Sequence, residues 1–298
     1  MNRPVHPNLF VIGAMRSGTT TFHRHLLAHP QVFMSSDPKE PSYFLTREQL
    51  LDVQPGLEKR GFWRGEDRYL ELFKDAGDRP VVGEASANYA RLPRVSGVAE
   101  RVAEFNPRAR ILYLMRDPVE RTISHYWYMV RHFGEQRDVF SALRQEPDYT
   151  ATSHYAMQLE PWLSRFGESQ VHALTMEQML RDPQSTMSRV FAWLGVDPAF
   201  ILPNPAEHQN AAPEQVQQVR GAGRAQRFRH SALWNAVGPL VPARLRRLGR
   251  GLSERKVART AVDLSSARRY LVELHTPQVR KLEALLGMEY PEWTSVGR

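Results

Sequence analysis

Short apolar runs alternate with amphipathic segments along the first two thirds of the chain. Runs of this length, bounded by polar turn residues, are typical of strands buried on both faces. They predict strands at Leu9–Ile12, Gln31–Met34, Val81–Glu84, Ile111–Met115 and Val171–Thr175. Helical spacing of the apolar positions predicts helices at Thr19–Ala28, Glu66–Lys74, Val98–Phe105, Val119–His132, Tyr155–Phe166, Gln184–Leu194 and Ser266–Leu286. Strands that alternate with helices in this way indicate an α/β protein, in which a central parallel sheet is flanked by helices.

The chain is expected to form a single domain over residues 1–298. Its length of 298 residues fits one sizeable domain, and no segment has the composition of a linker between two units. Residues 203–215 are polar and contain prolines, which indicates a loop. Residues 216–262 are rich in arginine with scattered Leu, Val and Trp, so we expect a basic, helical insertion there.

The positive charge is concentrated in one segment. Residues 220–259 contain eleven Arg or Lys and one Glu, whereas the net charge of the whole chain is only +8. This segment could guide an anionic acceptor and a charged cofactor, lie on an anionic membrane surface, or form solvated helices of purely structural use. Nucleic-acid binding is not favoured, because aromatic residues for base stacking are not interleaved with the arginines.

The absence of cysteine excludes disulfides, thiolate nucleophiles and thiolate metal sites. No signal peptide and no apolar stretch of membrane-spanning length is visible in the sequence. A cytoplasmic protein is the simpler interpretation, with peripheral membrane contact through residues 220–259 as an alternative. No group of residues has metal-ligand spacing, so no metal is expected in the site.

The most informative segment is LFVIGAMRSGTTTFHRHL, residues 9–26. An apolar run, a glycine-containing turn and an amphipathic stretch follow one another, which is the strand–loop–helix arrangement that holds a phosphate. Gly13 and Gly18 have the five-residue offset of a P-loop, but Thr19 stands where the P-loop lysine would be. Without that lysine the loop is poorly equipped to activate a triphosphate. A nucleotide with a single 5′-phosphate or a phosphosulfate is therefore the more suitable ligand.

A second strand-to-helix unit lies at RILYLMRDPVERTISHYWY, residues 110–128. Arg116 ends the predicted strand, at the sheet edge where ligands bind in open α/β folds. Pro118 suits an early helical position, and Ser124 follows about two turns later. A guanidinium and a hydroxyl in this arrangement can hold a second phosphate.

Together these two motifs resemble the sulfotransferase superfamily that uses 3′-phosphoadenosine 5′-phosphosulfate (PAPS). The family motif R-x-P-x-x-R-x-x-S-x-Y is matched by Arg116, Pro118, Arg121, Ser124 and Tyr126. The segment KEPSYF at 39–44 strengthens the likeness, which is closest to the heparan-type glycan sulfotransferases and their bacterial relatives. The resemblance covers most of the chain apart from 203–262. It implies a P-loop-like nucleotide-binding (sulfotransferase) fold and PAPS as co-substrate, with no metal.

The resemblance also implies roles for individual residues. The cofactor-binding residues would be Arg16, Ser17, Gly18, Thr19, Thr20, Thr21, Arg116 and Ser124. Glu40 would be the general base, and Lys39 would orient the sulfuryl oxygens. Arg16 occupies the place of a catalytic lysine in the glycan enzymes, where it keeps the charge but is a poor proton donor. The late loop that covers PAPS in those enzymes has no clear counterpart, and His208–Pro213 is the segment to inspect for one.

Several alternatives stay open at this point. The acceptor would be a hydroxyl of a carbohydrate, a glycolipid, another lipid-linked compound or another small molecule, and amines are not excluded. The chain could instead be an ATP-dependent small-molecule kinase with a degenerate P-loop, or a non-catalytic nucleotide-binding protein. Glu84 and Ser86 end a predicted strand on the ligand side, where they could contact substrate or form buried hydrogen bonds.

Overall fold

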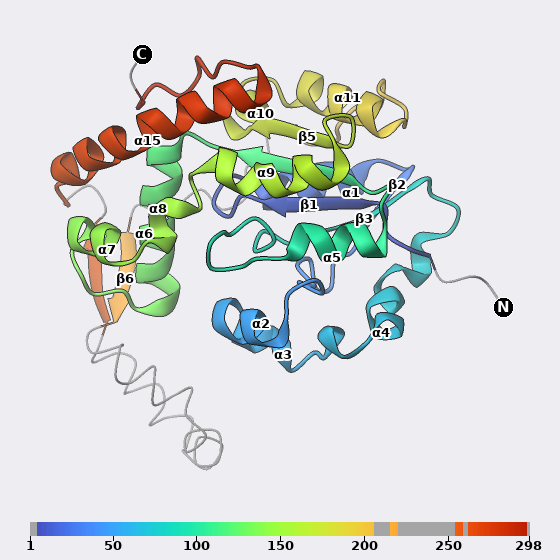
Figure 1. The fold of residues 1–298 in the computed structure, drawn as a ribbon, viewed down its shortest axis with the longest axis horizontal. Coiled ribbons are helices and arrows are strands. Elements are labelled where there is room, and N and C mark those ends of the chain that lie inside the picture. Colours follow the sequence, from blue (N-terminus) through green and yellow to red (C-terminus); the bar gives the residue numbers. More distant parts are fainter. Residues whose placement is uncertain (1–4, 206–214, 220–253, 259–261, 297–298) are drawn as a thin grey trace, which may run out of the picture.

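In the computed structural model, a five-stranded parallel sheet forms the centre of the molecule (Figure 1). The structure describes residues 5–205, 215–219, 254–258 and 262–296. The sheet has the order β2-β3-β1-β4-β5. Its strands are β1 (Leu9–Gly13), β2 (Val32–Met34), β3 (Val81–Ala85), β4 (Arg110–Met115) and β5 (Val171–Thr175). The α/β fold class and all five strands predicted from the apolar runs are confirmed.

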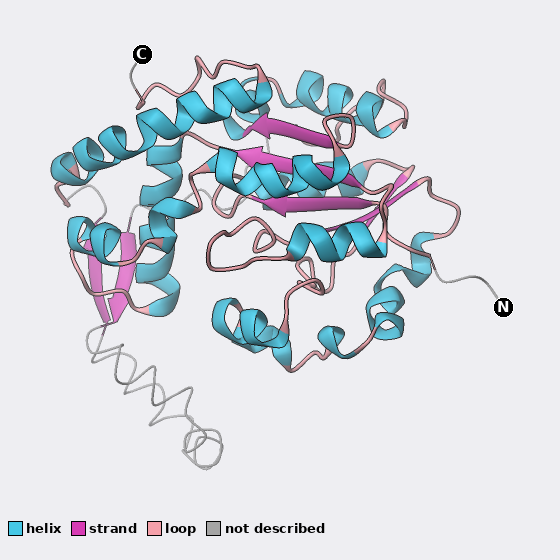
Figure 2. Ribbon diagram, in the orientation of Figure 1, coloured by secondary structure: helices cyan, strands magenta, loops and turns pink. Residues whose placement is uncertain are grey.

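Helices connect the strands and cover both faces of the sheet (Figure 2). The α-helices are α1 (Thr19–Ala28), α2 (Arg47–Val53), α3 (Pro55–Glu58), α4 (Glu66–Leu70), α5 (Val98–Phe105), α6 (Pro118–Phe133), α7 (Val139–Gln145), α8 (Asp148–Ala151), α9 (Tyr155–Phe166), α10 (Met176–Arg181), α11 (Pro183–Leu194) and α15 (Ser265–Leu286). Two 3₁₀ helices are η1 (Phe62–Arg64) and η2 (Glu71–Ala76). The helix expected at 66–74 is therefore divided into α4 and a tighter 3₁₀ turn.

Alternate residues of the central strand β1 enter two different cores. Phe10 and Ile12 belong to a core that α5 and α9 close on one face of the sheet. Leu9 and Val11 belong to a core that α1 and α11 close on the other face. Because both faces are buried, the strand is apolar throughout rather than alternating, which is why it was visible as a continuous run in the sequence.

The connections place the ends of β1 and β4 side by side. From β1 the chain passes to β2 and returns through β3 on one side, and from β3 it crosses to β4 on the other side. This reversal of strand order opens a crevice at the carboxyl ends of β1 and β4, the usual ligand site of such sheets. The loop after Gly13 and the residue after Met115, Arg116, both lie at that edge.

The expected helical insertion at 216–262 is wrong for its two ends. Gln215–Val219 forms strand β6 and Glu254–Ala258 forms strand β7, and the two pair antiparallel in a separate two-stranded sheet. Strand β6 lies beside α6. Residues 220–253 and 259–261, which carry most of the basic charge, are outside the described residues, as is His208–Pro213.

Candidate active site

A cavity of about 1120 Å³ opens at the crevice between β1 and β4. Its volume lies slightly above the range of about 300–1,000 Å³ that is usual for ligand pockets, so a large ligand such as a nucleotide would fit. Nine of the ten residues that the sequence singled out line it, namely Arg16, Ser17, Gly18, Thr19, Thr20, Thr21, Glu40, Arg116 and Ser124. The tenth, Lys39, adjoins the cavity through Glu40, because its Nζ lies 3.1 Å from Glu40 Oε1. The structure thus brings together residues that are more than a hundred positions apart in sequence.

The loop between β1 and α1 has the geometry of an anion cradle. Arg16 and Gly18 have left-handed backbone conformations, with φ of 72° and 86°. Helix α1 follows Gly18 directly, and no side chain caps its first turn. The first N–H groups of a helix have no partner within it and point outward with the positive end of the dipole. Ser17 Oγ is buried without a hydrogen-bond partner among the described residues, so the loop still offers a donor to a ligand.

Arg16 connects this loop to helix α6. Its Nε donates a hydrogen bond of 3.1 Å to Ser124 Oγ, and its guanidinium carbon lies 5.1 Å from the centre of the Tyr128 ring. The guanidinium is therefore held against the wall that carries Ser124, by a hydrogen bond and a cation–π contact. Tyr128 was not identified from the sequence, where it is one of several aromatic residues in an amphipathic helix.

The end of β4 is fixed by the cap of α6 and by groups from two distant parts of the chain. The Tyr155 hydroxyl donates to the backbone oxygen of Arg116 at 2.6 Å. Asp117 caps α6 by accepting from the N–H groups of Val119 and Glu120 at 3.0 and 3.1 Å. Ser295, near the end of the chain, donates its N–H to Asp117 at 3.1 Å. The Arg116 side chain lines the cavity and makes no hydrogen bond or ion pair within the described part of the chain. Its guanidinium is therefore available to bind an anion.

Lys39 and Glu40, in the segment after β2, lie beside the start of α1. Lys39 Nζ lies 3.4 Å from the hydroxyls of both Thr19 and Thr20 and forms an ion pair with Glu40. The side chains of Lys39 and Glu40 are 20% and 27% exposed, so both are reachable from the cavity. A single ammonium group thus joins the start of α1 to a carboxylate that lines the cavity.

Beyond Glu40 the wall of the cavity is polar, and most of it was not found from the sequence. The residues are Asp52, Gln54, Asn88, Arg91 and Arg94. They come from α2, the turn after it and the segment after β3, and only the segment after β3 lay near a predicted strand end. Gln54 sits in a stretch without clear helical periodicity, so nothing in its sequence context marked it.

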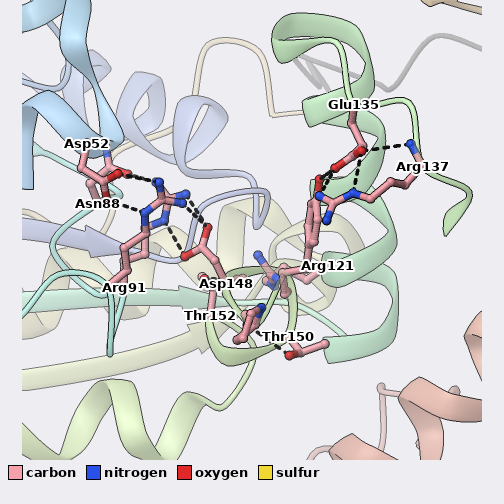
Figure 3. A network of polar contacts seen from close by, with 12 residues as sticks. Asp52, Asn88, Arg91, Arg121, Glu135, Arg137, Asp148, Thr150 and Thr152 are labelled. Carbon is pink, nitrogen blue, oxygen red and sulfur yellow. Dashed lines mark hydrogen bonds and ion pairs between the residues drawn. The ribbon is translucent and has the colours of Figure 1, made fainter. Parts of the chain in front are cut away.

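The side chains of this wall hold one another. Asn88 donates through Nδ2 to Gln54 Oε1 at 3.2 Å. Its Oδ1 accepts from Arg91 Nη1 at 2.9 Å (Figure 3). Arg91 is buried and forms a two-point ion pair with Asp148, in which Nε lies 3.0 Å from Oδ1. Although burial opposes ionisation, the Arg91 contact lowers the pKa of Asp148, so the pair stays charged. The wall is therefore rigid as well as polar.

Apolar side chains also line the cavity, and one of them lies beside Gly18. Met176, Met179 and Leu180 of α10 line it, and a Cβ at Gly18 would lie 3.5 Å from Met176 Cγ. Phe133, at the end of α6, contributes a half-exposed ring. One cavity thus offers an anion cradle, an apolar surface and a polar wall.

Comparison with known proteins identifies the family. The profile described as "Sulfotransferase family" matches residues 7–200. The chain belongs to the sulfotransferase family. The resemblance that rested on the motifs at 9–26, 39–44 and 110–128 is confirmed.

Curated relatives of this sulfotransferase include two glycan-modifying enzymes. It is 26% identical over 210 residues to the bifunctional heparan sulfate N-deacetylase/N-sulfotransferase 4 of Mus musculus, which covers 65% of this chain and 23% of the relative. It is 25% identical over 268 residues to carbohydrate sulfotransferase 15 of Rattus norvegicus, which covers 68% of this chain and 47% of the relative. The chain thus spans less than a quarter of the first relative and about half of the second.

Solved structures show the same fold. A crystal structure of a sulfotransferase from Alicyclobacillus acidocaldarius has a TM-score of 0.66 and 26% identity, and covers 97% of this chain and 99% of that one. Retinol dehydratase in complex with androsterone and the inactive cofactor PAP has a TM-score of 0.51 and 14% identity, and covers 97% of this chain and 84% of that one. The second likeness concerns the fold alone.

Two further findings concern the described residues only. The described residues contain no group of three His, Asp or Glu side chains placed to hold a metal ion. None of their helices combines the length and the apolar character that crossing a membrane requires.

Proposed function

We propose that this sulfotransferase moves the sulfuryl group of PAPS to an acceptor hydroxyl by in-line transfer. The observation that supports this most directly is the convergence of two anion-binding sites, one on the loop at 16–21 and one at Arg116 and Ser124, in a single cavity with Glu40. Their side-by-side placement on β1 and β4 suits a nucleotide with phosphate groups at both its 5′ and 3′ positions.

The loop would hold the 5′-phosphosulfate. Backbone N–H groups of residues 18–21 and the Ser17 hydroxyl, which has no hydrogen-bond partner among the described residues, would bind the phosphate at the positive end of α1. Arg116 and Ser124 would hold the 3′-phosphate, with Arg116 as a charged fork. Arg16, which is hydrogen-bonded to Ser124, would contact the nucleotide between its two phosphates.

The transfer step needs a base and a stabilised leaving group. The acceptor oxygen attacks sulfur while the bond from sulfur to the 5′-phosphate oxygen breaks, and that oxygen keeps the electron pair. Glu40 takes the proton of the acceptor hydroxyl, a contribution of about 10²–10⁴ in rate. Lys39, which contacts both Glu40 and the start of α1, would orient the sulfuryl oxygens and offset the charge that develops on the phosphate.

The polar wall beyond Glu40 is the proposed acceptor site. Its amide and guanidinium groups suit hydroxyl-bearing compounds, which is consistent with a carbohydrate or another polar small molecule. A glycolipid or another lipid-linked acceptor would place its polar part there. Cytoplasmic location and membrane contact through residues 220–259 remain predictions.

Titration calorimetry with 3′-phosphoadenosine 5′-phosphate (PAP), AMP and ATP tests the nucleotide assignment. We expect PAP to bind much more tightly than AMP, because AMP lacks the phosphate that Arg116 and Ser124 would hold. Equal affinity for PAP and AMP would refute the assignment. Magnesium-dependent ATP binding that exceeds PAP binding would support the kinase alternative instead.

Product formation from PAPS separates an enzyme from a non-catalytic binding protein. Incubation with PAPS and panels of polar and lipid-linked alcohols should yield PAP together with a sulfated product. Tight PAP binding without transfer to any acceptor class, and with no effect of Glu40→Ala, would favour the non-catalytic alternative.

A further inference from the structure

The segment that carries Glu40 is anchored by two side-chain hydroxyls. The backbone N–H of Ser42 donates to Ser86 Oγ at 3.0 Å, and the backbone N–H of Phe44 donates to the Tyr89 hydroxyl at 3.3 Å. Both N–H groups belong to the stretch that follows Glu40 directly, and both bonds are buried. The position of this stretch therefore depends on Ser86 and Tyr89.

Both hydroxyls donate their protons to one carboxylate. Ser86 Oγ donates to Glu84 Oε2 at 2.6 Å, and the Tyr89 hydroxyl donates to Glu84 Oε1 at 2.8 Å. Tyr69, on α4, donates to the same Oε1 at 2.8 Å. Glu84 is 0% exposed, lies in β3 and is not among the residues that line the cavity, so it does not itself reach a substrate. Of the two uses that the sequence left open for Glu84 and Ser86, the structure shows the buried hydrogen bonds.

The carboxylate determines the direction of these hydrogen bonds. A hydroxyl has one proton, and an ionised carboxylate can only accept. With their protons committed to Glu84, Ser86 and Tyr89 must present lone pairs on their other side, where the N–H groups of Ser42 and Phe44 lie. Glu84 thus sets the donor and acceptor of each hydrogen bond between its carboxylate and the backbone of residues 42–44.

We infer that Glu84 is a positioning residue for the sulfuryl-transfer step, which acts through Ser86 and Tyr89 to fix the backbone beside Glu40. This inference rests on the proposed function of Glu40 as the general base. A base must lie within hydrogen-bond reach of the proton it abstracts, and a displacement of about 1 Å can cost about 10² in rate. Anchoring the stretch next to Glu40 therefore has a direct catalytic use.

One further observation supports this role, and the titration of Glu84 limits the pH range in which it holds. Ser42 has a left-handed backbone, with φ of 53°, and its hydroxyl donates to Gln54 at 3.1 Å, which ties the same stretch to the polar wall. Burial, opposed by the three hydroxyl donors and assisted by the charge of Glu40, raises the pKa of Glu84 to about 7, so the hydrogen-bond directions given above are those of the ionised carboxylate at higher pH. The ionisable groups around Glu84 are Tyr69 on α4, Tyr89 after β3 and, at longer range, Glu40.

Three single-atom deletions test the inference. Ser86→Ala and Tyr89→Phe each remove a hydroxyl that links Glu84 to the 42–44 stretch. Tyr69→Phe is the matched control, because it removes a hydroxyl that donates to the same carboxylate oxygen but contacts no backbone of that stretch. Phenylalanine retains the stacking on Tyr43, whose ring centre lies 4.1 Å away.

Hydrogen–deuterium exchange of the peptide around residues 39–45 is the first measurement. We expect faster exchange at this peptide in Ser86→Ala and Tyr89→Phe and unchanged exchange in Tyr69→Phe. The second measurement is the rate of PAP release from PAPS in buffer, with water as the acceptor, alongside the affinity for PAP. Well above pH 7, where Glu84 stays ionised, the two linking variants should lose about tenfold in rate at unchanged PAP affinity, while Tyr69→Phe retains the rate.

The outcomes separate this inference from the proposed function. If Tyr69→Phe loses as much rate and protection as the two linking variants, or if none of the three changes exchange at 39–45, Glu84 has only a structural role and the inference is overturned. Failure of the wild-type protein to bind PAP would instead overturn the proposed function. An unchanged rate of PAP release in both linking variants would likewise overturn the inference, even if their exchange at 39–45 is faster.

Discussion

The two sides of the cavity are built in different ways. The phosphate side consists of a short backbone loop, the start of α1 and two residues at the end of β4 and in α6, all within two continuous sequence motifs. The polar wall consists of side chains from α2, the turn after it and the segment after β3, which are held by Asp148 on α8. One side is made of main chain and local geometry, and the other is made of long-range contacts between side chains.

This difference explains how much the sequence revealed. A strand, a glycine turn and a helix form a phosphate cradle wherever they follow one another, so Gly13, Gly18 and Thr19 could be read directly. Arg116 could be placed because the carboxyl ends of parallel strands meet at one edge. The parallel sheet could be predicted from the apolar runs, because its strands contribute side chains to a core on each face.

The polar wall could not be read in this way. Gln54 and Asn88 meet only after the chain has folded, and neither residue type signals a partner in advance. The linking hydroxyls of Ser86 and Tyr89 are similar, because their role depends on Glu84 being buried beneath them. The basic segment at 216–262 was expected to be helical, yet strands near its two ends, β6 and β7, pair with each other, a contact between distant residues that local sequence does not predict.

The largest expected effect concerns the residue where the two sides meet. Glu40→Ala should lower turnover by about 10²–10⁴ while PAP affinity stays unchanged, because the base acts only on the acceptor proton. Single-turnover kinetics with PAPS, together with calorimetry for PAP, measures the two quantities separately. A variant with full turnover would remove Glu40 from the mechanism and leave the polar wall without its proposed catalytic neighbour.

The next largest effect is the pH dependence of stability that the titration of Glu84 produces. Its pKa in the folded protein is about 7 against an ordinary value of 4.5, so between these pH values the folded state binds a proton that the unfolded state has released. The contribution to the free energy of unfolding is present at low pH and is lost as the pH rises through 7, by about 3 kcal/mol. Urea unfolding of the wild type and Glu84→Gln at pH 4.5 and 8 should show the loss in the wild type only.

Activity should respond to the same titration in the opposite direction. Protonated Glu84 must donate one hydrogen bond, which leaves one of its three hydroxyl partners without an acceptor and disturbs the order of the network. The rate of PAP release should therefore fall below pH 7 in the wild type, with a step that Glu84→Gln lacks. A wild-type rate and stability that change together, in the same direction, would contradict this account.

A smaller effect is expected on the phosphate side. Arg116→Ala should weaken PAP binding by about 1.5–3 kcal/mol and leave AMP binding nearly unchanged, because a charge-assisted hydrogen bond to the 3′-phosphate is lost. Arg108→Ala is the matched control, since Arg108 is an exposed arginine just before β4 and far along the strand from the cavity edge. Equal losses for PAP and AMP in Arg116→Ala would place that guanidinium on a group the two nucleotides share.

The smallest effect sharpens the contrast between the two sides. Arg94 holds Asp52 by two hydrogen bonds of 2.6 and 2.8 Å, and these bonds lower the pKa of Asp52, yet the Asp52 side chain is 50% exposed. An ion pair this open contributes at most about 1 kcal/mol to stability, so Asp52→Asn should shift the free energy of unfolding by less than that. Because Asp52 and Arg94 both line the polar wall, the same variant should raise the KM for the acceptor and leave PAP affinity untouched. If Asp52→Asn weakened PAP binding as strongly as it affected the acceptor, the cavity could not be divided into two independently built sides, and the wall would have to be regarded as part of the nucleotide site.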